Sequence, residues 1–333
     1  MHILPDVVLT LLVGLLTAPL ILHLLRRAQL LDVPTWRSSH ATPTPRGGGL
    51  APALACLAGA VFSTNLTGVD RQLVITVATG MGVLGLLDDL RGLGPIPRLV
   101  AQLGVSSFAV LLLLTSPATR HLSGAVALLT TVLWLVSYTN AFNFMDGING
   151  LSVAQATVAG ITWMLLGTCY NVPSIAALGV IVLVAALTFA PYNFPRAAMF
   201  LGDVGSYFLG GWLASAAVLA LRASFPPEIV LAPLGLYAVD TSYTLARRVM
   251  RHEPWYRAHH DHIYQRLIAA GWTHFSTTLL LTMTMVAVTA FSAFSLTASP
   301  ALRALGDLFG LVVLAGYVKL PSLLTVRTAG EAQ

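Results

Sequence analysis

The sequence predicts an all-α protein in which residues 1–333 form one transmembrane domain with ten or eleven membrane-spanning helices. Hydrophobic residues make up 56% of the chain and only 9% are Asp, Glu, Lys or Arg, whereas soluble domains carry about 25% charged residues. The mean hydropathy is +0.79. This composition excludes a disordered chain, a disulfide scaffold and a nucleic-acid-binding protein, because the net charge of +5 is spread over loops between apolar segments.

Eleven apolar runs account for these crossings, since a hydrocarbon core of about 30 Å requires about 20 helical residues. Two of them leave the count open, because Gln72–Leu87 is short and rich in glycine and Ala304–Val318 contains Asp307. The expected spans are Ile3–Leu25, Gly48–Asn65, Gln72–Leu87, Leu99–Thr115, Leu122–Thr139, Leu151–Cys169, Ser174–Ala190, Gly205–Leu221, Ile229–Ala246, Phe275–Leu296 and Ala304–Val318.

The basic residues predict the orientation. Ile3–Leu25 has no basic residue before it and is followed by Arg26 and Arg27, which is typical of an anchor with its N-terminus outside and not of a cleaved signal peptide. The loops after odd-numbered spans, with the C-terminal tail, hold fourteen of the 18 Lys and Arg residues. The positive-inside rule therefore places these loops in the cytoplasm, at approximately residues 26–47, 88–98, 140–150, 191–204 and 247–274.

The polar residues gather in those same loops. Asp89, Asp146, Asp203 and His259 follow one another at intervals of 57, 57 and 56 residues, and each interval holds two crossings and a turn. Every cluster therefore returns to the same membrane face. Because carboxylates at the ends of apolar helices are costly unless they are paired or bound to a cation, the clusters predict one site reached from both water and lipid.

The surroundings of Asp203 suit a metal ion and a phosphate. Flanking glycines let the backbone approach a phosphate, and the amides that open the following span favour anions. A carboxylate here suits Mg²⁺, which prefers oxygen ligands and often shares them with substrate phosphates, although a tight turn would also explain the sequence. Asn143 and Asp146 lie on one face if their segment is helical, and both offer oxygens to the same centre.

Two other clusters have more than one interpretation. Asp88 and Asp89 point about 100° apart on a helix, so one can bind a metal or act as a base while the other orients an Arg or Lys; a solvated helix end is the alternative. The segment from His259 to His262 lacks the thiolates common in zinc sites and is rich in nearby arginine. It is either a solvated loop or a phosphate-binding or acid–base element. Together the clusters favour phosphoanhydride exchange on a pyrophosphate with a lipid-borne acceptor.

At these residues the chain resembles the polyprenyl-phosphate N-acetylhexosamine-1-phosphate transferases, or glycosyltransferase family 4, which include the phospho-MurNAc-pentapeptide transferase. The resemblance extends from about Leu31 to Gly271. The motifs that carry it are Arg-Ser-Ser-His at 37–40, Pro-Thr-Pro-Arg-Gly-Gly-Gly at 43–49, the Asp-Asp pair, Asn-x-x-Asn-x-x-Asp-Gly at 140–147 and Gly-Asp-x-Gly-Ser at 202–206.

This resemblance implies transfer of a sugar 1-phosphate from a UDP-N-acetyl amino sugar to undecaprenyl phosphate, dependent on Mg²⁺ with Mn²⁺ as a substitute. UMP leaves, and the lipid-linked product initiates a cell-envelope glycan such as O-antigen. It further implies a multi-pass protein of the bacterial inner membrane with a cytoplasmic active site, and dimers occur in the family. UDP-GlcNAc, UDP-GalNAc, UDP-FucNAc and UDP-QuiNAc all remain open as donors.

Residue by residue, the resemblance makes Asp203 the metal-binding aspartate, with Asn143 joining it. Asp88 matches the proposed base on the lipid phosphate or, in an older proposal, the nucleophile, and Phe200 matches an aromatic that stacks on uracil. The full set of candidate catalytic residues is Asp88, Asp89, Asp146, His259 and His262. The candidate substrate-binding residues are Arg37, His40, Arg46, Asn149, Arg196, Phe200 and Asp240.

The sequence departs from the family at two motifs. Asn149 replaces the second acid of the usual Asp-Gly-x-Asp-Gly, so we expect it to lie near uracil and to have no metal role. Residues 258–265 resemble the Ala-His-x-x-His-x-Tyr-Gln form of transferases that initiate O-antigen and similar glycans. His259 and His262 fit that form, and His260 is additional.

Three alternative functions fit the sequence less well. A phospho-MurNAc-pentapeptide transferase is disfavoured by the histidine motif. A CDP-alcohol phosphotransferase would require a dense Asp-Gly-x-x-Ala-Arg run, which is absent. A transporter for an anionic solute would show inverted repeats and charges at the midplane, whereas the charges here cluster at one interface.

Overall fold

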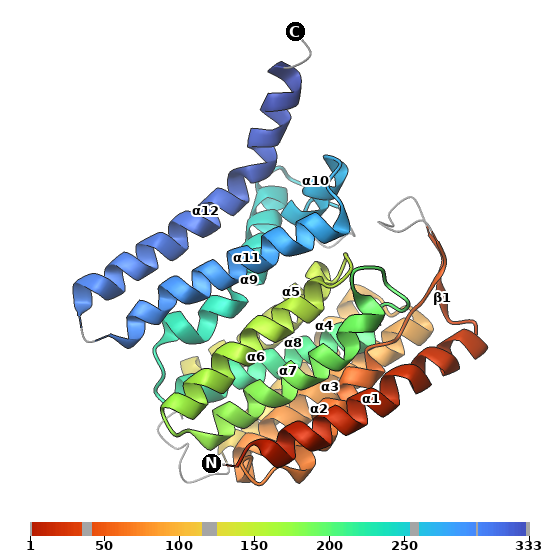
Figure 1. The fold of residues 1–333 in the computed structure, drawn as a ribbon, viewed down its shortest axis with the longest axis vertical. Helices are drawn as coiled ribbons and strands as arrows, with labels where there is room; N and C mark the ends of the chain where they lie inside the picture. The colour runs from red at the N-terminus through yellow and green to blue at the C-terminus, as the bar shows by residue number, and fades with distance from the viewer. Residues whose placement is uncertain (1, 35–41, 115–124, 254–259, 298, 331–333) are drawn as a thin grey trace.

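The computed structural model describes residues 2–34, 42–114, 125–253, 260–297 and 299–330, and these form twelve α-helices with one two-stranded sheet (Figure 1). Strands β1 (Leu31–Asp32) and β2 (Thr44–Pro45) pair in antiparallel fashion. The helices are α1 (Leu4–Arg27), α2 (Leu50–Phe62), α3 (Gly68–Arg91), α4 (Pro95–Leu114), α5 (Ala125–Met145), α6 (Leu151–Cys169), α7 (Pro173–Asn193), α8 (Gly202–Arg222), α9 (Pro227–Met250), α10 (Ile263–Ala269), α11 (His274–Ser292) and α12 (Pro300–Gly330), and α11 continues into the 3-10 helix η2 (Ala293–Leu296).

Ten of these helices are long and apolar enough to cross a membrane, which confirms the prediction of an all-α polytopic membrane protein. The two runs that left the count open are the long helices α3 and α12. Instead, the run Gly48–Asn65 gives a short helix, α2, which has only 13 residues and is about 20 Å long. Ten full crossings and one half-length helix therefore replace the eleven expected spans among the described residues.

Proline and glycine set many helix boundaries. Pro95, Pro173, Pro227 and Pro300 each begin a helix, where the missing N–H costs nothing and the fixed φ is already helical. Gly92 ends α3 with φ of +63° and donates its N–H to the Asp88 carbonyl. Most expected boundaries lie within about four residues of the helix ends, but α5 extends beyond Thr139 to Met145 and α12 extends beyond Val318 to Gly330.

Helix α8 forms the centre of the bundle, and almost its whole length is buried. Glycines allow the close approach of its neighbours: a Cβ added to Gly85 of α3 would lie 2.1 Å from the carbonyl oxygen of Asp203. Small residues at such contacts are the usual means by which membrane helices pack, because lipid supplies no hydrophobic force between helices. The beginning of α8 is thereby locked against the end of α3.

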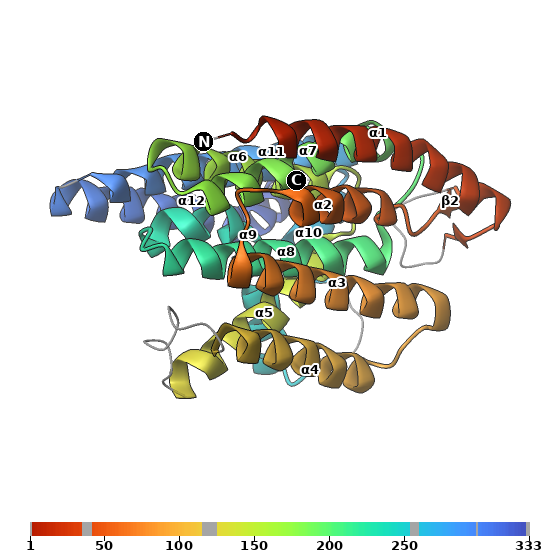
Figure 2. The same ribbon diagram turned by 90° about the horizontal axis from the view of Figure 1, so that it is seen from below.

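The remaining helices surround α8 in a fixed order. Helices α1 and α4 lie on opposite sides of the bundle (Figure 2), while α11 and α12 pack beside α9 (Figure 1). Helices α1, α3, α5 and α7 finish at the end of the bundle where α2, α4, α6 and α8 begin. We call this end the site end, because the predicted polar clusters meet there.

Candidate active site

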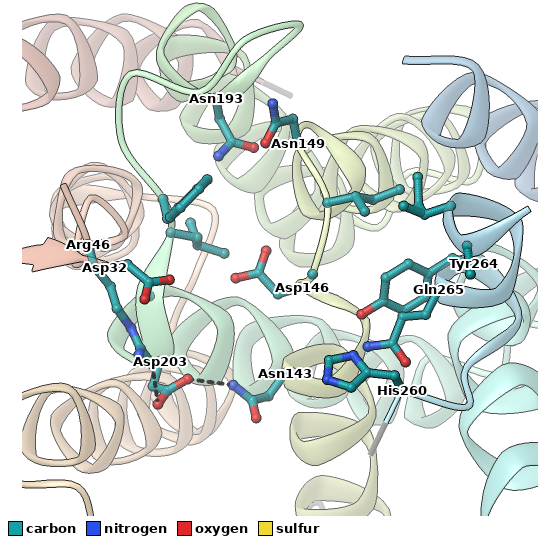
Figure 3. A pocket seen from close by; sticks show the side chains of 17 residues that line it. Asp32, Arg46, Asn143, Asp146, Asn149, Asn193, Asp203, His260, Tyr264 and Gln265 are labelled. Atoms are coloured by element: carbon teal, nitrogen blue, oxygen red, sulfur yellow. Dashed lines mark hydrogen bonds and ion pairs between the residues drawn. The ribbon is translucent and has the colours of Figure 1, made fainter. Parts of the chain in front are cut away.

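A cavity of about 460 Å³ opens at the site end. Figure 3 shows Asp203 and Arg46 on one side of it, His260, Tyr264 and Gln265 on the other, and Asp146 between them. We call the first side the α8 wall (Arg46 and residues 200–203) and the second the α10 wall (His260, Tyr264, Gln265, Ile268 and Ala269). Residues more than 200 positions apart in the sequence thus line one space, as the spacing of the clusters predicts.

Asp203 lies at the start of α8 and is the best-connected carboxylate of the α8 wall. Its Oδ2 accepts a 2.8 Å hydrogen bond from Nη2 of Arg46, and its Oδ1 accepts one of 2.8 Å from Nδ2 of Asn143. Gly202, with φ of +73°, sets the sharp entry into the helix. The α8 N-terminus also places its partial positive charge beside this carboxylate, which favours anions there.

Asp89 caps α8 and does not line the cavity. Its carboxylate accepts hydrogen bonds from the N–H groups of Asp203 and Val204 at 3.0 and 2.9 Å, and it forms an ion pair with Nε of Arg46 at 2.8 Å. Arg46 therefore bridges two carboxylates. This placement explains the Asp89 charge by capping and pairing, and gives it no direct contact with the cavity.

Arg46 is held in place by backbone pairing on both sides of it. The N–H of Phe200 donates to the Pro45 carbonyl, and the N–H groups of Gly48 and Gly49 donate to the carbonyls of Phe200 and Leu201, each at 2.8 Å. A Cβ on Gly49 would lie 2.2 Å from Cα of Gly205. The glycines of the 43–49 motif are therefore required for contact with α8.

Asp88 points away from Asp89, as expected for adjacent residues on a helix. It is buried, and it accepts 2.7 Å hydrogen bonds from Nη1 of Arg98 in α4 and from the N–H of Leu93. The two carboxylates thus face different partners. Asp88 belongs to the α3–α4 side of the site end, and Asp203 to the cavity.

Asp146 stands one residue beyond α5 and faces the middle of the cavity (Figure 3). Ser152 donates a 2.6 Å hydrogen bond to its Oδ1. Burial raises the pKa of its carboxyl to about 7, the nearby negative charge of Asp203 acts in the same direction, and the Ser152 hydrogen bond acts against both. Asn143 lies on the last turn of α5 and Asp146 just beyond it, so the two do not share a helical face, but both line the cavity.

Asn149 and Phe200 line the cavity as the sequence analysis predicts. The Asn149 side chain donates to the Pro195 carbonyl at 3.2 Å, and the backbone carbonyl of Asn149 accepts from Oγ1 of Thr278 at 2.8 Å. Arg196 is exposed and does not line the cavity. Arg37, His40 and His259 lie outside the described residues, so their predicted roles stay predictions.

The histidine segment is arranged differently from the expectation. His260, taken as additional in the motif, lines the cavity, whereas His262 is buried and its Nδ1 lies 2.9 Å from Oδ1 of Asp240. Asp240 is fully buried and does not line the cavity. Neither Asp240 nor His262 lines the cavity, because the two side chains contact each other and the Asp240 carboxylate also accepts from the start of α10.

Four cavity-lining polar residues besides His260 escaped the sequence analysis: Asp32, Asn193, Tyr264 and Gln265. Tyr264 and Gln265 belong to the quoted motif, whose Tyr-Gln pair was a usable signal. Asp32 carries no such signal, because it reaches the cavity only through the pairing of β1 with β2. Asn193 ends α7 and accepts a hydrogen bond from the Gly150 N–H at 2.8 Å.

Within the described residues, no three His, Cys, Asp or Glu side chains are grouped to hold a metal ion alone. The carboxylates of Asp203 and Asp146 and the amide of Asn143 nevertheless offer oxygen donors around one cavity. Mg²⁺ commonly takes one or two carboxylates and completes its shell with water and substrate phosphates. This donor set fits such an ion, provided that the Asn143 amide turns its oxygen toward it.

The sequence matches the family Glycosyl transferase family 4 over residues 72–221, from α3 to the end of α8. It is 31% identical over 293 residues to the probable undecaprenyl-phosphate N-acetylglucosaminyl 1-phosphate transferase of Bacillus subtilis, covering 83% of this chain and 81% of that protein. The chain belongs to this family. The family match contains Asp88, Asp89, Asn143, Asp146 and Asp203, and it ends before the α10 wall.

Two other relatives show the breadth of this family. The decaprenyl-phosphate N-acetylglucosaminephosphotransferase of Mycobacterium leprae is 28% identical over 317 residues, with 82% of this chain and 78% of that protein covered. The phospho-N-acetylmuramoyl-pentapeptide-transferase of Halalkalibacterium halodurans is 30% identical over 221 residues, with 60% and 66% covered.

Proposed function

We propose that this chain transfers an N-acetyl amino sugar 1-phosphate from a UDP-linked donor to undecaprenyl phosphate or a similar polyprenyl phosphate. UMP leaves, and a lipid-linked pyrophosphoryl sugar that initiates a cell-envelope glycan remains. The names of the Bacillus and Mycobacterium relatives support this reaction, and a donor carrying GlcNAc is accordingly the first to test.

The arrangement of Asp203, Arg46 and Asn143 at the start of α8 is the observation that carries the proposal. A carboxylate, a guanidinium and a helix N-terminus converge on one cavity, and this combination suits a pyrophosphate with its bound cation. Mg²⁺, held by Asp203 with Asn143 and the donor phosphates, would supply positive charge to the reacting phosphate. Phe200 and Asn149, on the same cavity, are proposed to contact the uridine part of the donor.

The surroundings of Asp88 favour a lipid acceptor on the α3–α4 side. Arg98, its ion-pair partner, lies among exposed apolar residues of α4, including Ile96, Leu99 and Val100. A lipid chain can lie along this surface while its phosphate reaches the Arg98 and Asp88 pair. We assign Asp88 as the base that takes the proton of the lipid phosphate, because hydrogen bonds from Leu93 and Arg98 orient its carboxylate.

In the proposed reaction an oxygen of the acceptor phosphate attacks the phosphorus that carries the sugar. The bond from that phosphorus to the UMP oxygen breaks, and UMP leaves with the bonding electrons. Arg46 orients Asp203 through the 2.8 Å contact, and the positive charge of Arg46 offsets the negative charge gathered around the cavity. We place this site on the cytoplasmic face of the bacterial inner membrane, because the basic loops belong to the site end.

The test is to assay purified protein in detergent with Mg²⁺, undecaprenyl phosphate and a panel of UDP-N-acetyl amino sugars, following UMP release. Turnover with one donor, lost on chelation with EDTA and restored by Mg²⁺ or Mn²⁺, is expected. UDP-MurNAc-pentapeptide belongs to the panel, because the Halalkalibacterium relative carries that activity in its name. UMP release with UDP-MurNAc-pentapeptide alone would show that this compound is the donor and that the proposed amino sugars are not. No release with any donor would refute the proposal.

A further inference from the structure

The α10 wall of the cavity is built on a helix too short to be stable alone. Helix α10 has seven residues, Ile263–Ala269, whereas isolated helices shorter than about 12 residues are marginal in water. It nevertheless brings Tyr264 and Gln265 to the cavity opposite Asp203 (Figure 3). Side chains elsewhere must therefore hold it in place.

A buried carboxylate holds the beginning of α10. Both oxygens of Asp240 in α9 accept from the N–H of Ile263, at 3.2 and 3.1 Å, and Oδ1 lies 2.9 Å from Nδ1 of His262. The hydroxyl of Tyr317 in α12 donates to Oδ2 at 2.6 Å. A buried charge is tolerated only with good hydrogen-bonding geometry, so Asp240 ties α9, α10 and α12 together at one point.

An ion pair lies two turns further along α9. Arg248, of which 9% is exposed, binds the carboxylate of Asp261 and also Oε2 of Glu253 at 3.0 Å. Helix α9 thus presents an anion and a cation eight residues apart, and these bind two consecutive residues, His262 and Asp261. A shift of residues 261–262 by one position along α9 would place two carboxylates together or leave a buried charge unpaired. The two contacts therefore fix the register of these residues against α9.

Helix α10 and His262 also contact the residues on either side of Asp146. The hydroxyl of Tyr264 donates to the Phe144 carbonyl at 3.0 Å, and a Cβ on Gly147 would lie 2.1 Å from that hydroxyl oxygen. The rings of Phe144 and His262 lie 6.1 Å apart. Displacing α10 would therefore also displace the residues beside Asp146.

We propose that Asp240 and Arg248 are positioning residues, which set His260, Tyr264 and Gln265 against the donor by holding Asp261, His262 and the start of α10. We call the contacts of Asp240 and Arg248 with residues 261–263 the clamp. The effect of the clamp on donor binding rests on the proposed function, but the clamp itself does not. Because Tyr317 donates to Asp240, the last helix of the chain contributes to the donor site without lining it.

The kinetic test uses D240N, which keeps the size of the side chain, and the charge exchange of Arg248→Glu with Asp261→Arg, made singly and together. We expect the donor KM to rise about tenfold in each single variant, the worth of one charge-assisted hydrogen bond. The acceptor KM is expected to change less than about twofold, and the double exchange to recover most of the donor KM. A variant that is only misfolded would have a smaller active fraction, but its donor KM would not rise more than its acceptor KM.

Glu228→Gln is the matched control, because the Glu228 and Arg303 pair also joins α9 to α12, at 3.7 Å, but at the end of the bundle away from the cavity. This variant is expected to keep both KM values. If D240N does not fold, Tyr317→Phe removes only one hydrogen bond from Asp240 and carries the same test with a smaller shift of donor KM.

Hydrogen–deuterium exchange of the peptide covering α10 separates the two proposals, since it needs no turnover. Faster exchange in the single variants and recovery in the double exchange support the clamp, even if the wild-type protein uses none of the tested donors. Unchanged exchange overturns the clamp. Faster exchange with equal changes in both KM values, or a double exchange no better than the singles, overturns the positioning role.

Discussion

The two walls of the cavity are constructed in different ways. The α8 wall is fixed chiefly by backbone contacts: Gly48 and Gly49 donate to carbonyls of residues 200 and 201, and the side chain of Asp89 adds a cap to the helix that follows. The α10 wall is fixed by side chains, chiefly Asp240 and Arg248, acting on a seven-residue helix. Backbone contacts between glycines tolerate almost no substitution, whereas a clamp of side chains can be repositioned by single changes.

This difference teaches where chemistry and selectivity can reside. In the proposed reaction, Asp203 and Arg46 of the α8 wall contact the pyrophosphate, which all the candidate donors share. The α10 wall lies across the cavity from them, and we propose that it makes the contacts that differ between donors. Each prediction below tests one side of this comparison.

The largest effect is expected from Asp203→Asn in the α8 wall. The variant loses the negative charge that pairs with Arg46 and is proposed to hold Mg²⁺, so we expect turnover to fall at least about 1,000-fold, or about 4 kcal/mol of transition-state stabilisation. UMP release by purified protein measures this. Asp70→Asn, which removes a carboxylate paired with Arg222 at 3.9 Å at the other end of the bundle, is the control. Wild-type turnover in Asp203→Asn would remove this residue from the mechanism.

A large effect on stability is expected from Gly85→Ala, which tests the backbone contact behind the same wall. The added Cβ would lie 2.1 Å from the Asp203 carbonyl oxygen, so α3 and α8 must separate, at a cost of about 3 kcal/mol. Gly104→Ala in α4 meets no atom within 4 Å and is expected to leave the melting temperature unchanged. Equal melting temperatures for both variants would show that the α3–α8 contact is not tight.

A smaller effect, dependent on pH, is expected at Asp146. Because burial raises the pKa of its carboxyl to about 7, the folded protein keeps a proton that the unfolded chain releases near pH 4. The resulting stabilisation is greatest at low pH and is lost as the pH rises towards 7. Between pH 5.5 and 8 the metal-free protein should lose up to about 2 kcal/mol. Thermal melts in EDTA measure this loss, and Asp146→Asn should remove most of it; an identical pH profile in the variant would assign the effect to another group.

The smallest effect is expected from Arg196→Ala. The sequence analysis takes Arg196 as a substrate-binding residue, but its side chain is exposed and outside both walls. We expect kcat/KM for either substrate to change less than about twofold, as for ordinary surface positions. A tenfold loss would show that Arg196 reaches the donor or acceptor during turnover.

Much of this architecture could be predicted because apolar runs and proline and glycine boundaries are local signals. The opposite directions of Asp88 and Asp89 follow from helix geometry alone. The position of the start of α2 against α8 could not be predicted, because the contact of Gly49 with Gly205 joins residues about 150 positions apart. Nor could the motif show which histidine faces the cavity, since that depends on the pairing of His262 with Asp240 in another helix.

The shortness of α2 also determines where non-helical backbone lies. Thr17 reaches the Ala51 carbonyl near the start of α2, and Asn65 reaches Asp6 just beyond its end, so α2 runs beside only the first half of α1. Opposite the last turns of α1 the chain is non-helical: it is extended at Thr44–Pro45, bridges to Phe200 at Arg46, and turns at Gly48 and Gly49. Non-helical backbone within a membrane protein persists only where protein or water satisfies it, and here the carbonyls of Phe200 and Leu201 do so. The helical turns that α2 lacks are thus replaced by a short strand and a glycine turn, which bring the Arg46 guanidinium alongside apolar helices.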